Sequence, residues 1–198
     1  MSESYDCIVI GGGPAGATTS TILADFGHRT LVLERARFPR HHIGESLMPQ
    51  TYWILKRIGM YEKLKASDFP PKESVQFVNA SGKESQPYYF TDRDPGEWSV
   101  TWQVKRDKFD KMMLDNAREH GVEVREGVSV KEVLFEGKRA VGVRATVGGA
   151  SQDIRAKVVI DATGVNALLS KQLGIRDGEP GLKNAAIYAY WKGAHRDP

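Results

Sequence analysis

The chain has 198 residues, enough for one sizeable domain, or for one domain and part of a second. Its net charge of +3 comes from basic and acidic residues dispersed along the sequence, so we predict no nucleic-acid surface. No apolar run reaches membrane-spanning length, and the N-terminus enters an apolar stretch without room for a signal peptide. The single cysteine, Cys7, has no partner for an internal disulfide, and we expect a buried thiol in a cytoplasmic protein.

The most informative stretch is an apolar run followed by closely spaced glycines. Residues 6–10 have the length and composition of a buried parallel strand, and residues 11–16 follow with the spacing Gly-x-Gly-x-x-Gly. In this pattern Gly11 allows a tight turn, Gly13 lets the backbone approach a diphosphate, and Gly16 lets the next helix pack against the strand. The free N–H groups at the start of that helix favour an anion.

The residues after the glycines complete a strand–helix–strand unit. Pro14 suits the first helical turn, and Gly27 is predicted to end the helix. One face of this helix is expected to carry Ile22, Leu23 and Phe26. Residues 30–33 read as the second strand, which Glu34 closes. A carboxylate roughly 20 residues past the glycines binds a ribose diol and disfavours a 2′-phosphate, so the unit indicates a dinucleotide other than NADP. A Gly-rich turn in an ordinary α/β unit is the alternative, which the order of these elements disfavours.

Hydrophobic periodicity predicts the remaining elements. A helix is expected over residues 46–66, broken near Gly59, and a second over residues 106–120. The stripe on the second helix is expected to lie in the core, and comprises Phe109, Met112, Met113 and Ala117. Strands are expected at residues 75–78, 88–90, 99–104, 122–125, 129–135, 140–147, 151–156, 158–161 and 185–191.

Five motifs in this order resemble FAD-dependent monooxygenases of the glutathione-reductase-like fold. They are Gly-Gly-Gly-Pro-Ala-Gly at 11–16, Glu34, Gly44-Glu45-Ser46, Arg106-Asp107-x-Phe109-Asp110, and Asp161-Ala-Thr-Gly164. Within that group, Phe38-Pro39-Arg40 leading to His42-Ile43-Gly44-Glu45-Ser46-Leu47 resembles the flavin-dependent halogenases. The resemblance covers nearly the whole chain and implies FAD as the cofactor.

The implied fold is α/β, a parallel-sheet FAD-binding domain of the Rossmann type. It would carry a three-stranded β meander over residues 125–157 and the start of a substrate-binding β region. Two later family motifs are absent, Gly-Asp followed by small residues and Trp-x-Trp-x-Ile-Pro. We therefore expect residues 1–198 to be a FAD-binding domain that is incomplete at its C-terminal end. Residues 68–105 and 183–198 are expected to belong to a substrate-binding subdomain.

The resemblance also implies which residues bind the cofactor. The diphosphate would be held by Gly11, Gly13 and Gly16, with Pro14, Ala15 and, nearby, Arg106. The adenosine ribose would be bound by Glu34, followed by Arg35, and the turn behind the site would contain Asp161, Thr163 and Gly164. The segment passing the flavin would be Gly44, Glu45 and Ser46. Two of these residues have a simpler alternative role: Glu45 as an acid at a helix N-terminus, and Ser46 as a helix N-cap.

Lys72 is the candidate catalytic residue, since halogenases place an essential lysine a short distance after Gly-Glu-Ser. A solvated surface lysine is the alternative. His41 and His42 lack a third ligand at suitable spacing, so we predict no metal site. Arg37 and Arg40 lie either in solvent or near the FAD phosphates, and the sequence does not decide between these.

The implied function is an oxidation that uses reduced FAD and O₂, in a halogenase with halide as co-substrate. The substrate would be an aromatic or other electron-rich small molecule, either free or bound to a carrier. Electrons would come from a separate flavin reductase or from transiently bound NAD(P)H. The alternatives are a hydroxylase or a prenyl-chain reductase on the same scaffold, and a nucleotide-binding fragment without turnover.

Overall fold

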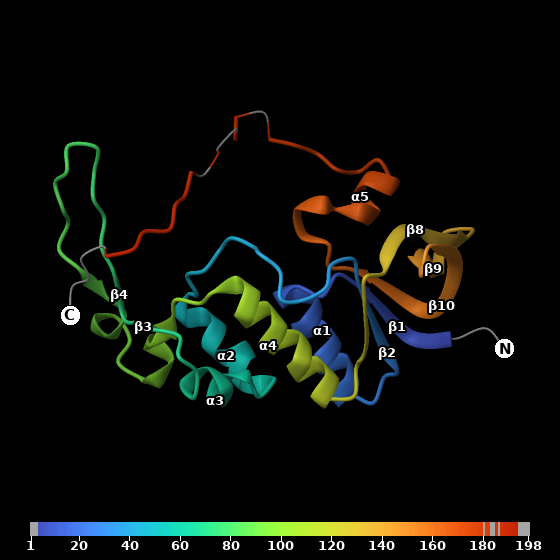
Figure 1. Ribbon diagram of the computed structural model, residues 1–198, viewed down its shortest axis with the longest axis horizontal. Coiled ribbons are helices and arrows are strands. Elements are labelled where there is room, and N and C mark those ends of the chain that lie inside the picture. The colour runs from blue at the N-terminus through green and yellow to red at the C-terminus, as the bar shows by residue number, and fades with distance from the viewer. Residues whose placement is uncertain (1–3, 180, 183–184, 186, 194–198) are drawn as a thin grey trace.

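A six-stranded sheet organises the chain in the computed structural model, which describes residues 4–179, 181–182, 185 and 187–193 (Figure 1). The strand order is β7 (Glu123–Glu126), β2 (Thr30–Glu34), β1 (Ser4–Ile10), β10 (Ala150–Asp161), β9 (Arg139–Val147) and β8 (Ser129–Glu136). The pairs from β7 to β10 are parallel, and β9 and β8 continue the sheet antiparallel. The predicted α/β fold with a parallel sheet is confirmed.

Strand β10 joins the parallel and antiparallel halves. Residues 150–155 pair with β9, and residues 155–161 pair with β1, so that Arg155 lies opposite both Gly142 and Ser4. The prediction of separate strands at 151–156 and 158–161 was wrong: β10 is one continuous strand, because the sequence between the two segments contains no turn residue. The meander therefore consists of β8, β9 and the first half of β10. It does not include residue 125, which lies in β7 at the opposite edge of the sheet.

Two long helices pack against each other beside the sheet (Figure 1). Helix α1 (Pro14–Asp25) begins at the predicted proline and ends before Gly27, whose φ of 82° is left-handed. Helix α4 (Arg106–Glu119) buries Phe109, Met113 and Ala117, as predicted. The expectation for Phe26 was wrong: its side chain is 67% exposed, because it follows the last helical residue and extends away from the buried face.

The predicted helix at 46–66 is shorter and begins later. It consists of the 3₁₀ turn η1 (Pro49–Thr51), α2 (Tyr52–Arg57) and α3 (Met60–Lys65), with the expected break at Gly59, where φ is 75°. Residues 45–47 are extended instead, because the Val104 N–H donates to the Glu45 carbonyl at 2.7 Å and the Leu47 N–H donates to the Trp102 carbonyl at 3.1 Å. Glu45 and Ser46 are therefore neither a helix N-terminal acid nor an N-cap.

The segment 68–105 forms two small sheets outside the main one. Strand β3 (Pro71–Lys72) pairs with β6 (Thr101–Trp102), and β4 (Ser74–Val75) pairs with β5 (Tyr88–Tyr89). The 3₁₀ turns η2 (Phe90–Asp92) and η3 (Glu97–Ser99) connect them. These strands are shorter than predicted because the residues beyond them, such as Phe77, which is 70% exposed, have no neighbouring element to pack against.

The turn after β10 leads to η4 (Gly164–Asn166) and α5 (Leu168–Gln172), from which the C-terminal segment crosses the molecule (Figure 1). The predicted strand at 185–191 is not observed in residues 185 and 187–191, which have no regular structure. Residues 183, 184, 186 and 194–198 lie outside the described part of the chain, so the domain prediction for 183–198 falls partly outside it. Among the described residues, no helix combines the length and apolar character needed to cross a membrane.

Candidate cofactor-binding site and an adjoining lysine

A cleft of about 490 Å³ opens at the carboxyl ends of β1, β2 and β10. Carboxyl ends of parallel strands are where nucleotides bind in open α/β sheets. The cleft brings together most of the predicted cofactor residues, namely Gly11, Gly13, Pro14, Ala15, Glu34, Arg35, Arg106, Thr163 and Gly164. The predicted residues Gly16, Gly44, Glu45, Ser46 and Asp161 do not line it, and their positions are given below.

Gly16 and Gly11 each lie very close to a backbone carbonyl of a neighbouring segment. A Cβ atom on Gly16 would lie 1.9 Å from the Gly11 carbonyl oxygen, so this position seats α1 directly on the turn after β1. A Cβ on Gly11 would lie 2.6 Å from the Ala162 carbonyl oxygen, and its φ is 106°. At Gly13 a Cβ would meet only the Arg40 guanidinium, at 3.5 Å. Gly13 therefore leaves open space at the α1 N-terminus, where first-turn N–H groups have no acceptor within the helix.

Glu34 is held at the edge of the cleft by backbone donors. Its side chain is nearly buried, with 6% of the residue exposed. The Gly12 N–H donates to Oε2 at 2.7 Å, and the Ala36 N–H donates to Oε1 at 2.8 Å. Each carboxylate oxygen can accept more than one hydrogen bond. The carboxylate is thus fixed in position and still has acceptor capacity toward the cleft.

Asp161 shapes the turn behind the site. Its carboxylate accepts hydrogen bonds from the Thr163 hydroxyl at 2.6 Å, the Thr163 N–H at 2.9 Å and the Leu169 N–H at 2.7 Å. Burial by itself raises the pKa of Asp161, but the bonds from Thr163 and Leu169 outweigh it and hold that pKa below its ordinary value. Asp161 therefore orders the residues that line the cleft, and does not line it itself.

Asp110, a buried carboxylate that the sequence analysis quoted in a motif without giving it a role, contacts two arginines beside the cleft. Arg106 donates to it through Nε at 2.6 Å and Nη2 at 3.0 Å, and Arg40 Nη1 lies 3.2 Å from Oδ2. Arg106 Nη1 also donates to the Ile43 carbonyl at 2.7 Å and the Gly44 carbonyl at 3.3 Å. The spacing Arg106-x-x-x-Asp110 on a helix was the signal available in the sequence.

The segment 44–46 connects the cleft to Lys72. Glu45 accepts a hydrogen bond from the Tyr190 hydroxyl at 2.9 Å, which raises the pKa of Tyr190. The Lys72 ammonium donates to the Ser46 hydroxyl and lies 5.6 Å from the centre of the Phe90 ring. The β3–β6 pairing and the Ser46–Gln103 bridge bring these segments together. Residues 26 positions apart in the sequence thus meet at one point.

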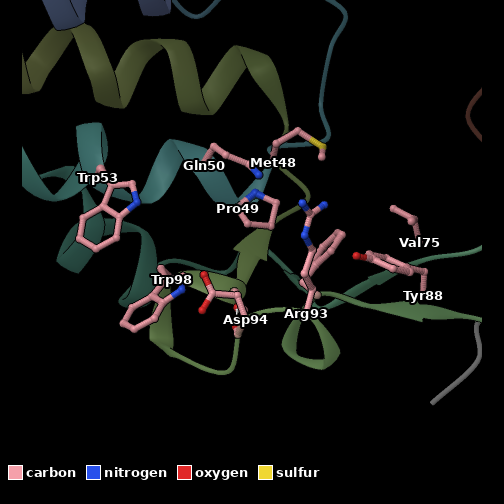
Figure 2. Close-up of a pocket in the computed structure, with 11 residues that line it drawn as sticks. Met48, Pro49, Gln50, Trp53, Val75, Tyr88, Arg93, Asp94 and Trp98 are labelled. Carbon is pink, nitrogen blue, oxygen red and sulfur yellow. Dashed lines mark hydrogen bonds between the residues drawn. The ribbon is translucent and has the colours of Figure 1, made fainter.

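A second cavity, of about 430 Å³, has Phe90 among the residues that line it. Figure 2 shows Trp53 and Trp98 at one side of it and Val75 and Tyr88 at the other, with Arg93 between them. The rings of Trp53 and Trp98 stack with centroids 5.8 Å apart. Its lining is mostly apolar and aromatic, which suits a small planar apolar group.

The two adjacent histidines, His41 and His42, line the cleft. His41 Nε2 lies 3.1 Å from the Tyr188 hydroxyl. No cluster of three or more His, Cys, Asp or Glu side chains suited to a metal occurs within the described residues. The polar groups of the cleft are instead backbone N–H and guanidinium donors and one carboxylate acceptor, Glu34. That set fits a dinucleotide such as FAD.

Comparisons with known proteins agree with this geometry. The chain is 36% identical over 208 residues to the 1H-pyrrole-2-carbonyl-[peptidyl-carrier protein] chlorinase of Pseudomonas fluorescens, covering 96% of this chain and 46% of the relative. It is also 36% identical over 201 residues to the corresponding brominase of Pseudoalteromonas luteoviolacea, covering 100% of this chain and 48% of the relative. The chain thus spans about half the length of these relatives.

A solved structure gives the same result. The myxobacterial chondrochloren halogenase CndH, a FAD-dependent halogenase, superimposes with a TM-score of 0.80 at 42% identity, covering 85% of this chain and 39% of that one. Residues 4–188 match the FAD binding domain family. The predicted resemblance to flavin-dependent halogenases and the predicted cofactor are confirmed: the chain belongs to the FAD binding domain family, and FAD is its cofactor.

Proposed function

We propose that the protein containing this chain is a flavin-dependent halogenase of electron-rich aromatic substrates. The observation that supports the proposal is the contact between the Lys72 ammonium and the Ser46 hydroxyl, because Ser46 belongs to the segment 44–46 that Arg106, a residue lining the cleft, contacts through the Gly44 carbonyl. The halogenase relatives described above support halogenation over hydroxylation or prenyl reduction. The proposal assigns the site residues individually.

At the cofactor end of the site, the α1 N-terminus, Glu34 and the segment 44–46 would bind FAD. The open space at Gly13 and the α1 N-terminus would receive the diphosphate, and Glu34 would accept hydrogen bonds from the ribose hydroxyls. The segment 44–46, braced by Arg106 through its carbonyls, would lie along the flavin. When bound and reduced, FAD would supply two of the four electrons that O₂ takes up, and halide would supply the other two as it becomes hypohalous acid, with water as the second product of O₂.

Lys72 would act on the oxidised halogen. An ammonium can donate a hydrogen bond to the oxygen of hypohalous acid, which polarises the oxygen–halogen bond. The aromatic carbon then gains the halogen and loses a proton, and the oxygen leaves as water. Ser46 accepts one N–H of Lys72, and Phe90 lies beneath the ammonium, so the cation has a defined position. The aromatic cavity that Phe90 lines would hold the substrate.

Several wider assignments are part of the same proposal. The two relatives named for carrier-bound pyrrole substrates support an acyl substrate carried on a protein. We assign residues 68–105 to the substrate region, because they contribute Lys72 and most of the aromatic cavity. A separate flavin reductase would deliver the electrons, and the protein would work in the cytoplasm, where a single buried thiol such as Cys7 stays reduced.

The test is halide-dependent turnover of the full-length protein with reduced flavin, O₂ and chloride or bromide. Lys72→Ala and Lys72→Arg should both abolish halogenated product while flavin oxidation continues, because arginine keeps the charge but not the compact ammonium geometry. Lys83→Ala, the same change on the exposed hairpin, should retain activity. Halogenation by Lys72→Ala at near the wild-type rate would refute the catalytic role. A hydroxylated product formed equally well without halide would show a hydroxylase.

A further inference from the structure

Arg40 is positioned toward the cleft from a loop that the sequence alone could not place. Its guanidinium lines the cleft and lies 3.5 Å from the position a Cβ would take on Gly13, at the α1 N-terminus. Two contacts hold it there. The Phe38 ring centre lies 4.6 Å from the guanidinium carbon, and Asp110 lies 3.2 Å from Nη1. The side chain is 21% exposed, so a charged group is held at the boundary between the protein and the cleft.

The neighbouring arginine, Arg106, already donates hydrogen bonds to protein acceptors. Arg106 uses Nε and Nη2 to form a two-pronged pair with Asp110, and uses Nη1 for the Ile43 and Gly44 carbonyls. The Asp110 contact with Arg40 is an ion pair at 3.2 Å that does not meet hydrogen-bond geometry. Arg40 Nη1 is buried against Asp110, and Nη2 is the guanidinium nitrogen that lies toward Gly13, with no hydrogen bond to another described residue. Arg40 thus has donor capacity that Arg106 lacks.

The charge balance of this cluster also calls for an anion. Asp110 is fully buried and carries one negative charge, whereas Arg40 and Arg106 carry two positive charges. The carboxylate among the residues that line the cleft, Glu34, forms no ion pair with Arg40 or Arg106 among the described residues. Partly buried charges without full compensation are costly, and a phosphate at the helix N-terminus would remove that cost. The helix N–H groups and a guanidinium would then bind the same anion.

We propose that Arg40 is the side chain that binds the cofactor diphosphate, and that Asp110 is the positioning residue that holds it over Gly13. Arg106, which the sequence analysis placed near the diphosphate, instead braces the loop at Ile43 and Gly44. This inference depends on FAD binding by the chain and is independent of the proposed halogenation.

The chain contains a matched control arginine. Arg37 lies three residues before Arg40 in the same loop, is exposed, and approaches Gly127, where its Nε lies 3.5 Å from a Cβ position. It does not line the cleft. Arg37→Met and Arg40→Met therefore remove the same charge and keep a similar apolar stem, but only the second removes a group beside Gly13.

The experiment is titration of ADP, adenosine and FAD into the 198-residue chain by calorimetry, with circular dichroism to check folding. Arg40→Met should weaken ADP and FAD binding by roughly tenfold or more, because a charge-assisted hydrogen bond to phosphate is lost, and should leave adenosine binding unchanged. Its ADP affinity should also depend less on salt. Arg37→Met should bind all three ligands like the wild type. Arg40→Lys, which keeps the ion pair with Asp110, should lose several-fold in ADP affinity because the planar fork is gone.

Two results would overturn the assignment: wild-type ADP affinity in Arg40→Met, or an equal loss for adenosine and ADP. If Arg40→Met does not fold, Arg40→Lys decides the question, and an unchanged ADP affinity there refutes the role. A failure of halogenation in the full-length protein would leave these binding results untouched.

Discussion

The glycine-rich end of the sheet and the segment 68–105 are built in opposite ways. At the glycine-rich end, β1, α1 and β2 follow one another directly, and the side chains of β1 and β2 are almost wholly buried. In segment 68–105 the strands have two residues each, and the hairpin between β4 and β5 is exposed along most of its length. Close backbone packing determines the structure of the glycine-rich end. Short strand pairings determine the structure of segment 68–105.

This difference has a consequence for function. A nucleotide site needs backbone groups at fixed positions, and the glycine contacts provide them. A substrate region can vary its loops while Lys72 and Phe90, held by β3, β6 and η2, keep their place. We therefore expect substitutions at the glycine-rich end to affect folding and nucleotide affinity, and substitutions in the hairpin to leave both nearly unchanged.

The largest effect is expected at Gly16. A methyl group there would lie 1.9 Å from the Gly11 carbonyl oxygen, so α1 could not pack on the turn without a backbone shift. Gly16→Ala should lower the free energy of unfolding by about 3 kcal/mol or more. The control is Gly82→Ala in the hairpin, where nothing lies within 4 Å and only the left-handed φ of 79° opposes the change, at a cost of about 1 kcal/mol. Urea unfolding followed by circular dichroism measures both, and equal losses would contradict the comparison.

Glu34→Ala should have the next largest effect, on binding. Loss of charge-assisted hydrogen bonds to the ribose should cost roughly 1.5–3 kcal/mol, or about tenfold to a hundredfold in affinity. Adenosine and ADP should be affected alike, in contrast to Arg40→Met. The control is Glu136→Ala, since Glu136 is exposed and pairs only with Arg155 at the surface among the described residues. Affinities that stay equal between wild type and Glu34→Ala would rule out the ribose role.

Asp161→Asn should have a smaller, pH-dependent effect on stability. The folded-state pKa of Asp161 is lowered, so its contribution is present above the unfolded pKa, about 3.9, and is lost as pH falls through the folded value. At pH 7 the variant should be less stable by roughly 1–2 kcal/mol, because hydrogen bonds to a charged acceptor are weakened. Thermal unfolding at pH 7 and at pH 3 measures the difference. A difference in stability between wild type and variant that grows toward pH 3 would contradict this prediction.

The smallest effect is expected in the hairpin. Phe77→Ser should change the free energy of unfolding by less than about 0.5 kcal/mol, because the ring is 70% exposed. The same substitution at Phe109, which is 3% exposed and packs in the core between α1, α3 and α4, should cost about 3–5 kcal/mol. A large loss at Phe77 would mean that the hairpin contributes to the core after all.

Local patterns predicted the fold well where neighbours in sequence are neighbours in space. Pro14, Gly27 and Gly59 marked helix boundaries because their backbone preferences act at their own positions. The pattern at 151–161 was misread as two strands, since a change of pairing partner along one strand leaves no mark on its side-chain alternation. The helix expected from residue 46 was wrong for the same kind of reason: pairing of 45–47 with 102–104 outweighed the local preference.

The sequence by itself determined the dinucleotide unit of this protein: the glycine spacing, the acid at the end of β2 and the small-residue turn after β10 are local requirements of backbone geometry. Only the tertiary structure decided how the charged residues are used. Asp110 pairs with Arg106 through both of its oxygens, and Arg40 Nη2 lies toward Gly13. Arg37 is exposed near Gly127, and the Lys72 ammonium donates to the Ser46 hydroxyl. Long side chains choose partners by proximity in space, and that proximity is set by packing of elements far apart in the chain.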